Sequence, residues 1–177
     1  WRSRLRVPVV VNGGFFGERD NSLGLRIAKG KTLNDLRAAD WGVFYVRTSR
    51  RKSGLEAHIL HTSDFKKLPQ TLKNRVREAI QCGPRLVVEG RVLTFKEQWA
   101  RRTGIGISRN GQVVLAISEG ELTLRDWAIL WNSKSGLNCA DALNLDGGGS
   151  TQIAIKTARE NYKTGGAWPV PDVVYLR

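Results

Sequence analysis

An amide and an acid alternate immediately before three consecutive glycines in the segment 140–151, ADALNLDGGGST. Along a strand, this alternation places Asn144 and Asp146 on one face and the neighbouring leucines on the other. The glycines lack Cβ atoms, so their N–H groups can closely approach a polar or anionic ligand. Asp146 could then activate water or attack the ligand directly. The alternative is a tight turn, in which Asp146 only caps the glycines and Ser150 is a turn hydroxyl.

Three further motifs place a polar side chain beside glycine: Asn12-Gly13-Gly14, Gly83-Pro84-Arg85 and the segment 102–106, RTGIG. A guanidinium can bind two phosphate oxygens at once, so Arg102, and with less support Arg85, suits a phosphate group. The side chains of Asn12 and Asn144 suit hydroxyl or acetamido groups. Each arginine could instead be a surface charge.

Short β-branched and alternating segments, separated by glycine, predict the elements that would position these motifs. We expect strands over 7–11, 23–27, 42–48, 57–61, 86–88, 91–93, 103–108, 112–117, 140–146, 152–155 and 172–176. The basic loop 49–54 and a type I′ turn at Asn110-Gly111 predict hairpins. A polar loop over 157–168 could move or cover a site. The two alternating glycines at 104 and 106 indicate that something approaches that face of the strand closely.

Two helices are expected, over 69–80 and 123–131. The first has apolar residues at helical spacing and Pro69 in its first turn. The second begins at Thr123 with Asp126 as its capping partner, and its buried stripe is formed by Trp127, Leu130 and Trp131. With hairpin-connected strands, the fold class is α+β: a single domain over 1–177 with a mixed, mostly antiparallel sheet flanked by a few helices.

The composition restricts the classes of partner. The chain has 177 residues and a net charge of +13, which favours anionic partners. The basic residues are not interleaved with aromatic residues, so we expect no nucleic acid, and no apolar run approaches the roughly 20 residues of a membrane span. His58 and His61 fall on opposite faces of one strand, and we interpret both as structural. Cys82 and Cys139 form no CxxC or His-rich motif, which argues against a zinc site; we hypothesise a disulfide between them, which would suit a periplasmic or secreted protein.

Taken in order, the motifs resemble the phosphodiester glycosidase family. The resemblance is carried by VVNGGFF at 10–16, LGL at 23–25, QCGPRLV at 81–87, RRTGIGI at 101–107, the helix at 123–131 and ALNLDGGGS at 142–150. It implies hydrolysis of the glycosidic bond of a sugar-1-phosphodiester, with release of free sugar and a phosphomonoester. It also implies that an amino-terminal part of the domain is missing from this chain. Glu119 lies in a link shorter than the family's and inherits no role.

We therefore expect Asp146 and Arg102 to be catalytic, with no metal and no cofactor. The expected substrate-binding residues are Asn12, Gly13, Gly14, Arg85, Thr103, Asn144, Gly147, Gly148, Gly149 and Ser150. The expected partner is a sugar phosphodiester or a phosphate-containing glycopolymer. Because phosphate is a weakly basic leaving group, a strong general acid is less necessary than in ordinary glycoside hydrolysis. Two alternatives stay open: a phosphodiesterase that cuts the P–O bond, and a non-catalytic module that binds anionic glycopolymers.

Overall fold

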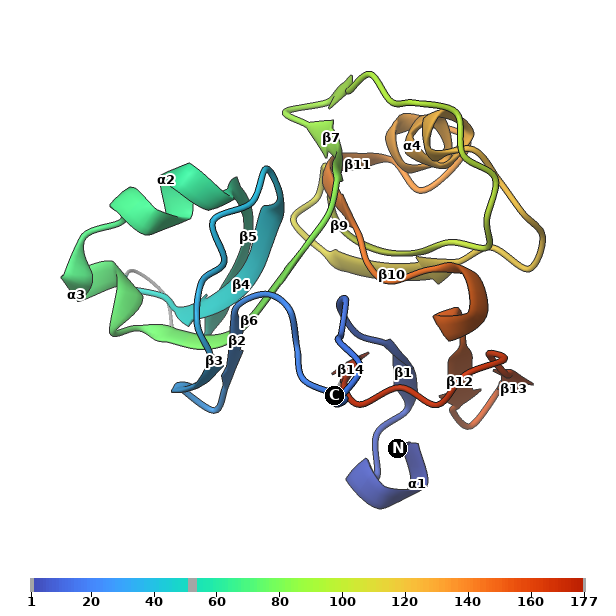
Figure 1. The fold of residues 1–177 in the computed structure, drawn as a ribbon, viewed down its shortest axis with the longest axis horizontal. Coiled ribbons are helices and arrows are strands. Elements are labelled where there is room, and N and C mark those ends of the chain that lie inside the picture. The colour runs from blue at the N-terminus through green and yellow to red at the C-terminus, as the bar shows by residue number, and fades with distance from the viewer. Residues whose placement is uncertain (1, 51–53, 177) are drawn as a thin grey trace.

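Three antiparallel sheets with few helices make up the computed structural model, which describes residues 2–50 and 54–176 (Figure 1). This confirms the predicted α+β class. The first sheet has the order β13 (Asn161–Thr164), β12 (Ile153–Lys156), β1 (Val9–Asn12), β14 (Val173–Leu176). The second has the order β10 (Val113–Ile117), β9 (Thr103–Ser108), β11 (Cys139–Asn144), β7 (Arg85–Val88), β8 (Arg91–Val92). The third has the order β3 (Lys31–Asn34), β2 (Arg26–Ala28), β6 (Val76–Cys82), β4 (Gly42–Thr48), β5 (Leu55–His61).

The helices are short and lie outside the sheets (Figure 1). They are α1 (Arg2–Leu5), α2 (Thr62–Lys67), α3 (Gln70–Lys73) and α4 (Leu124–Asn132), and a 3₁₀ turn, η1, covers Gly148–Ser150. Only α4 is long enough to present a continuous face, and it packs against β7 and β11. None of the described helices is long and apolar enough to cross a membrane.

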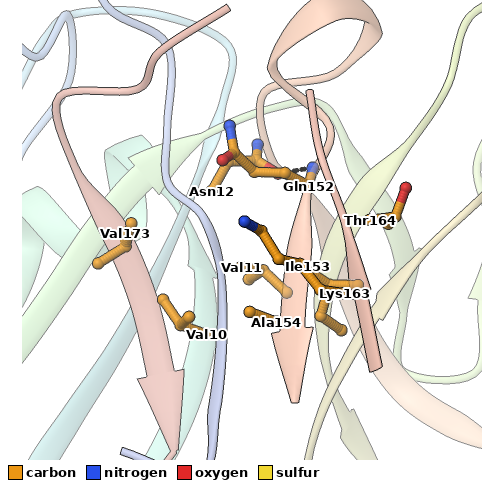
Figure 2. A pocket seen from close by; sticks show the side chains of 9 residues that line it. All are labelled: Val10, Val11, Asn12, Gln152, Ile153, Ala154, Lys163, Thr164 and Val173. Atoms are coloured by element: carbon orange, nitrogen blue, oxygen red, sulfur yellow. Dashed lines mark hydrogen bonds between the residues drawn. The ribbon is translucent and has the colours of Figure 1, made fainter. Parts of the chain in front are cut away.

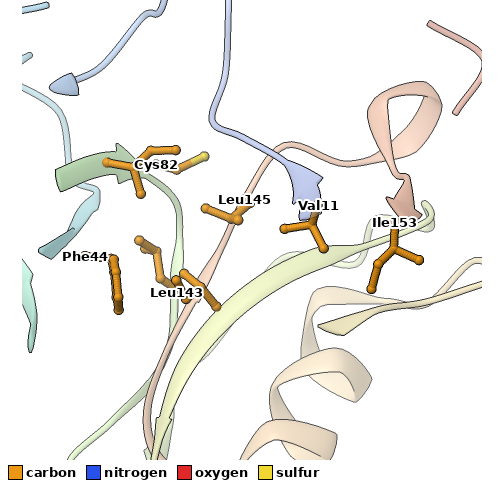
Figure 3. Packing of buried hydrophobic residues seen from close by; sticks show 8 residues of the cluster. Val11, Phe44, Cys82, Leu143, Leu145 and Ile153 are labelled. Carbon is orange, nitrogen blue, oxygen red and sulfur yellow. The ribbon is translucent and has the colours of Figure 1, made fainter. Parts of the chain in front are cut away.

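The three sheets share one hydrophobic core, to which each contributes side chains (Figure 3). Val11 and Ile153 come from the first sheet, Leu143 from the second, and Phe44 from the third. Leu145, one residue beyond β11, is also completely buried. Burial of each such side chain contributes about 1.5–3 kcal/mol. The core therefore lies directly behind the polar residues that alternate with these leucines.

Several local predictions are confirmed. Strands β4 and β9 have the predicted bounds, and β7 and β8 form the predicted hairpin. Hairpins β4–β5 and β9–β10 are also present, although residues 51–53 of the loop 49–54 lie outside the described residues. The turn between β9 and β10 is not type I′, because Gly111 has a positive φ of 78° and Asn110 does not. Gly111 N instead donates to Ser108 O at 2.8 Å, as in a three-residue hairpin loop with glycine in the left-handed position.

The helix at 123–131 is confirmed, and its cap has the expected geometry. Thr123 Oγ1 accepts from Asp126 N at 3.1 Å. Trp127 and Trp131 are buried, but Leu130 is 43% exposed and Ala128 takes its place in the core. The Trp131 ring lies against the glycine face of β9, where a Cβ on Gly104 would be 2.7 Å from Trp131 Cζ2. The prediction that something approaches the glycine face of this strand closely is therefore confirmed, and the approaching group is the Trp131 ring.

The helix expected over 69–80 is wrong. Helix α3 ends at Lys73, and Val76–Cys82 forms strand β6 between β2 and β4. Val76, Ala79 and Ile80 fit helical spacing, but they also fit a strand that is buried on both faces, and pairing with two neighbours decides for the strand. The loop expected over 157–168 is likewise interrupted by β13, which pairs with β12.

The hypothesised disulfide is also wrong: Cys82 and Cys139 are both free and buried. They belong to different clusters, Cys82 beside Phe44 and Leu143, and Cys139 beside Trp127 and Trp131. The structural interpretation of the histidines agrees with their contacts, since His58 stacks on Tyr45 and His61 caps α2. Because the cysteines are not paired, they give no support for export, and a periplasmic or secreted location stays a prediction.

Candidate active site at two glycine-rich loops

Asn12 is the residue that connects the polar-plus-glycine motifs. It ends β1 with its side chain completely buried. Its Nδ2 donates to Asp146 O at 2.7 Å, and its Oδ1 accepts from Thr103 Oγ1 at 2.7 Å and from Gln152 N at 3.2 Å. The structure thus brings three predicted site residues together, but these bonds use the Asn12 amide to hold the loops in place.

Asp146 lies two residues beyond β11, where its N donates to Gly13 O at 3.2 Å. Its Oδ1 accepts from Gly147 N at 2.9 Å, so the turn-capping alternative describes one of its two carboxylate oxygens. Burial raises the pKa of Asp146; the nearby Ser150 hydroxyl and the Gly147 N–H oppose this rise, and the charge of Asp172 adds to it. A half-buried carboxyl with a raised pKa is a candidate for proton transfer.

Asp172 is the site residue that the sequence analysis missed. It precedes β14 and its carbonyl accepts from Gly13 N at 3.1 Å. Its Oδ2 accepts from Ser22 Oγ at 3.0 Å and forms an ion pair with Arg26 Nε at 3.1 Å. Asp146 and Asp172 therefore flank the backbone of Gly13. The only signal in the sequence was an acid at the first position of the expected strand 172–176, with no glycine motif beside it.

Asn144, the last residue of β11, connects that strand to the motif Gly83-Pro84 through hydrogen bonds. Its Nδ2 donates to Gly83 O at 3.2 Å and to Leu145 O at 2.7 Å, and its backbone N donates to Pro84 O at 3.0 Å. Arg85 lies opposite Leu143 in the β7–β11 pair, with its side chain packed against Gly42. These contacts place Arg85 in the sheet, and its predicted role as a phosphate ligand stays a prediction.

Arg102 is neither on the surface nor bonded to Asp146 in the described chain. It is 5% exposed, its Nε donates to Leu122 O at 3.0 Å, and its terminal nitrogen donates to Gln98 O. Loss of solvation lowers the pKa of this guanidinium. Its role toward a ligand stays a prediction, whereas its contacts show an anchor for the segment 93–122.

The glycines at 147–149 are held close to their neighbours. A Cβ on Gly147 would lie 2.7 Å from Arg101 O, and Gly148 has a positive φ of 57°. Gly149 lies beneath the ring of Trp168. Gly14 is less tightly held, since its Cβ would lie 3.3 Å from Gln81 O. Substitution of Gly147 or Gly149 would displace backbone or an indole, whereas a Cβ on Gly148 would meet nothing within 4 Å and only the positive φ opposes a side chain there.

Residues of these site segments carry buried side-chain oxygens that have no hydrogen-bond partner among the described residues, and two of these residues, Ser150 and Asp172, are close enough to Asp146 to affect its pKa. Within the described part of the chain these atoms include Asn144 Oδ1, Ser150 Oγ, Thr151 Oγ1 and Asp172 Oδ1. The Ser150 hydroxyl is close enough to Asp146 to affect its pKa, but it is not aligned for a hydrogen bond. Buried polar groups in folded proteins are usually paired, so such a cluster is where a polar ligand or water would bind.

A separate hollow lies on the face of the first sheet (Figure 2). Val10, Ala154 and Val173 form part of its lining, and Lys163 extends across it toward Asn12 and Gln152. Of the predicted site residues, it includes only Asn12, so it is distinct from the carboxylate pair. Among the described residues, no group of His, Cys, Asp or Glu has the arrangement of a metal site.

Comparisons with known proteins give the family of the chain and proteins of similar fold. The family model described as phosphodiester glycosidase matches residues 6–177. The uncharacterized protein YigE of Escherichia coli is 28% identical over 94% of this chain and 62% of its own length. The auto-inhibited catalytic domain of zebrafish N-acetylglucosamine-1-phosphodiester alpha-N-acetylglucosaminidase has a TM-score of 0.68 at 21% identity, over 97% of this chain and 64% of that chain. A hypothetical protein from Synechocystis has a TM-score of 0.60 at 18% identity, over 87% and 48%. The chain thus spans less than two thirds of these proteins.

Proposed function

Because this chain belongs to the phosphodiester glycosidase family, we propose that it hydrolyses the glycosidic bond of a sugar-1-phosphodiester and releases free sugar and a phosphomonoester. The observation that carries the proposal is that Asp146 and Asp172 both bond to the backbone of Gly13, with the charge of Asp172 close enough to raise the pKa of Asp146. Paired carboxylates are the usual machinery of glycoside hydrolysis. Their surroundings differ, since Asp146 is desolvated and Asp172 is bound to Arg26.

The leaving group determines what the two carboxylates must do. A phosphate monoester departs without strong protonation, so the site has to stabilise an oxocarbenium-like sugar and direct a nucleophile at C1. Asp146 would activate the water or attack C1 itself. Asp172 would supply a second negative charge beside the developing positive charge of the sugar. The C1–O bond breaks, the phosphate oxygen keeps the electron pair, and water supplies the hydroxyl of the free sugar.

N-acetylglucosamine is the first sugar to test, since the zebrafish enzyme's name specifies it. The net charge of +13 supports an anionic substrate, including a phosphate-containing glycopolymer, and predicts binding that weakens as salt is raised. We would incubate the protein with N-acetylglucosamine 1-(methyl phosphate) and glucose 1-(methyl phosphate) in ¹⁸O-labelled water. The proposal requires label in the released sugar; label in the phosphate would instead show a P–O-cleaving phosphodiesterase.

Variants of the carboxylates test the site. Asp146→Asn and Asp172→Asn should each lower kcat/KM by about 10²–10⁴-fold, the range of general acid–base catalysis. Asp35→Asn is the matched control, because Asp35 is exposed at the edge of the third sheet. If both site variants fold normally and keep wild-type rates, the carboxylate pair is not the active site.

A further inference from the structure

The segment 165–172 crosses both glycine motifs of the site. At one end Trp168 N donates to Gly149 O at 3.1 Å, and at the other Gly13 N donates to Asp172 O at 3.1 Å. Asp172 is the fourth residue after Trp168, so their Cα atoms lie within roughly 14 Å of each other. The segment therefore connects Asp172 with an indole ring that lies against Gly149, three residues after Asp146.

The Trp168 ring is fixed in position and open to solvent. Its Cδ2, Cε2 and Cε3 atoms lie 2.8, 2.9 and 2.9 Å from the position that a Cβ would take on Gly149. The Trp168 carbonyl accepts from Gln152 Nε2 at 3.3 Å, yet the residue is 61% exposed. An exposed aromatic ring that the backbone already holds loses little conformational freedom when a ligand covers it.

Arg101 contacts the same loop through its backbone. Gly148 N donates to Arg101 O at 2.8 Å, which holds the Arg101 backbone against the glycines. Its terminal nitrogens make long bonds, at 3.4 Å to Gly165 O and at 3.5 Å to Thr164 Oγ1. Its Nε is buried and has no hydrogen-bond partner among the described residues. The guanidinium thus keeps donor capacity for an anion beside the loop.

We propose that Trp168 and Arg101 form the ligand-binding rim of the site, with Trp168 stacking on the sugar ring and Arg101 binding the phosphate. The inference rests on the proposed function, because it assumes a glycosyl phosphate as the ligand and assigns its sugar to one side chain and its phosphate to the other. A pyranose ring presents an apolar C–H face that suits an indole, while a guanidinium matches the geometry of phosphate oxygens. The loop 147–149 holds both residues, since Gly148 N donates to Arg101 O and Gly149 O accepts from Trp168 N.

Calorimetric titration of the whole chain tests the rim without requiring turnover. The probes are N-acetylglucosamine 1-phosphate, its neutral methyl glycoside and inorganic phosphate. Trp168→Ala should weaken binding of the sugar phosphate about ten-fold, and Trp168→Phe, which keeps an aromatic ring, should weaken it less. Trp99→Ala is the matched control, since Trp99 is 62% exposed.

Arg101→Gln should weaken binding of the sugar phosphate but not of the methyl glycoside, whereas Arg125→Gln on α4 should change neither.

The outcomes separate the two proposals. Equal affinities for Trp168→Ala and Trp99→Ala, or no binding of any probe by the wild-type protein, would overturn the rim. In a turnover assay the rim predicts a raised KM with a nearly unchanged kcat for Trp168→Phe. Binding that depends on Trp168 and Arg101 without hydrolysis of any phosphodiester would support the rim and remove the proposed activity.

Discussion

Asp172 Oδ1 occupies the space that a side chain on Gly13 would need. A Cβ on Gly13 would lie 1.8 Å from that oxygen and 2.6 Å from Asp172 Cγ. Gly13 N also donates to Asp172 O, and Gly13 O accepts from Asp146 N at 3.2 Å. This glycine is therefore required because a carboxylate is placed against its backbone, and because its two peptide groups join both acids.

The Gly13→Ala variant should lose stability and activity together. The methyl group must displace Asp172 from Gly13, and overpacking of this kind typically costs about 1–3 kcal/mol. Urea unfolding would measure the stability, and the phosphodiester assay would measure kcat. Gly120→Ala is the control, since nothing lies within 4 Å of its Cβ position. Equal stabilities of the two variants would contradict the packing of Asp172 on Gly13.

Asp146 should make the protein less stable as pH rises. Because burial raises its pKa above the ordinary 3.8, the folded protein retains a proton that the unfolded chain has released just above that value. The free energy of unfolding therefore falls as pH rises through this range, and this loss of stability remains at higher pH. Asp146→Asn removes the cost, so its stability relative to wild type should be greater at about pH 7 than at about pH 3. Thermal unfolding of the variant and of the wild type across this range measures the difference.

Substitution of Arg102 should lower the stability of the protein. Its guanidinium is buried against Leu122 O and Gln98 O, so Arg102→Gln would leave these carbonyls with fewer donors and cost roughly 1–3 kcal/mol. Urea unfolding checks this, with Arg125→Gln as the control. The earlier expectation, that Arg102 binds phosphate, predicts a different result: unchanged stability with a large rise in KM.

Local patterns predicted the elements whose structure is set locally. Thr123 and Asp126 define the start of α4, and the β-branched run 42–48 predicts β4 with its correct bounds. Strand β6 could not be predicted this way, because its conformation depends on pairing with β2 and β4 on both sides. Short apolar runs do not distinguish a helix from a buried strand.

The site was predictable only in part, for the same reason. The glycine motif marked Asp146 because the acid and the glycines are adjacent in the chain. Asp172 acquires its position from Gly13, near the opposite end of the chain, and no local spacing indicates that contact. In the Arg101-Arg102 pair, composition cannot tell which arginine reaches the glycine loop. The contacts with Leu122 and Gly148 decide it.

Both cysteines should be unreactive in the native protein. Burial raises the pKa of Cys82 to about 12 and that of Cys139 to about 11, so little thiolate exists at neutral pH. A thiol reagent should label neither residue until denaturant is added, when both should react. Reductant should leave the melting temperature unchanged, in contrast to a protein that depends on a disulfide.

Gln81 should support the site from within the core. It is 1% exposed; its Oε1 accepts from Leu25 N at 2.9 Å and from Arg37 N at 3.0 Å, while its Nε2 donates to Arg37 O at 2.8 Å and to Thr62 Oγ1 at 3.0 Å. Gln81→Leu would remove all four bonds, at about 1–3 kcal/mol for each buried group left unsatisfied.

Leu25 is followed by Arg26, the ion-pair partner of Asp172, so loosening this segment should also disturb the second carboxylate. We therefore expect Gln81→Leu to lower both the midpoint of urea unfolding and kcat. Gln112→Leu is the control, because Gln112 is exposed in the β9–β10 turn. A loss of stability with kcat unchanged in the folded fraction would show that Arg26 holds Asp172 without help from Gln81. Such a result would leave the carboxylate pair intact and remove only this link between the core and the site.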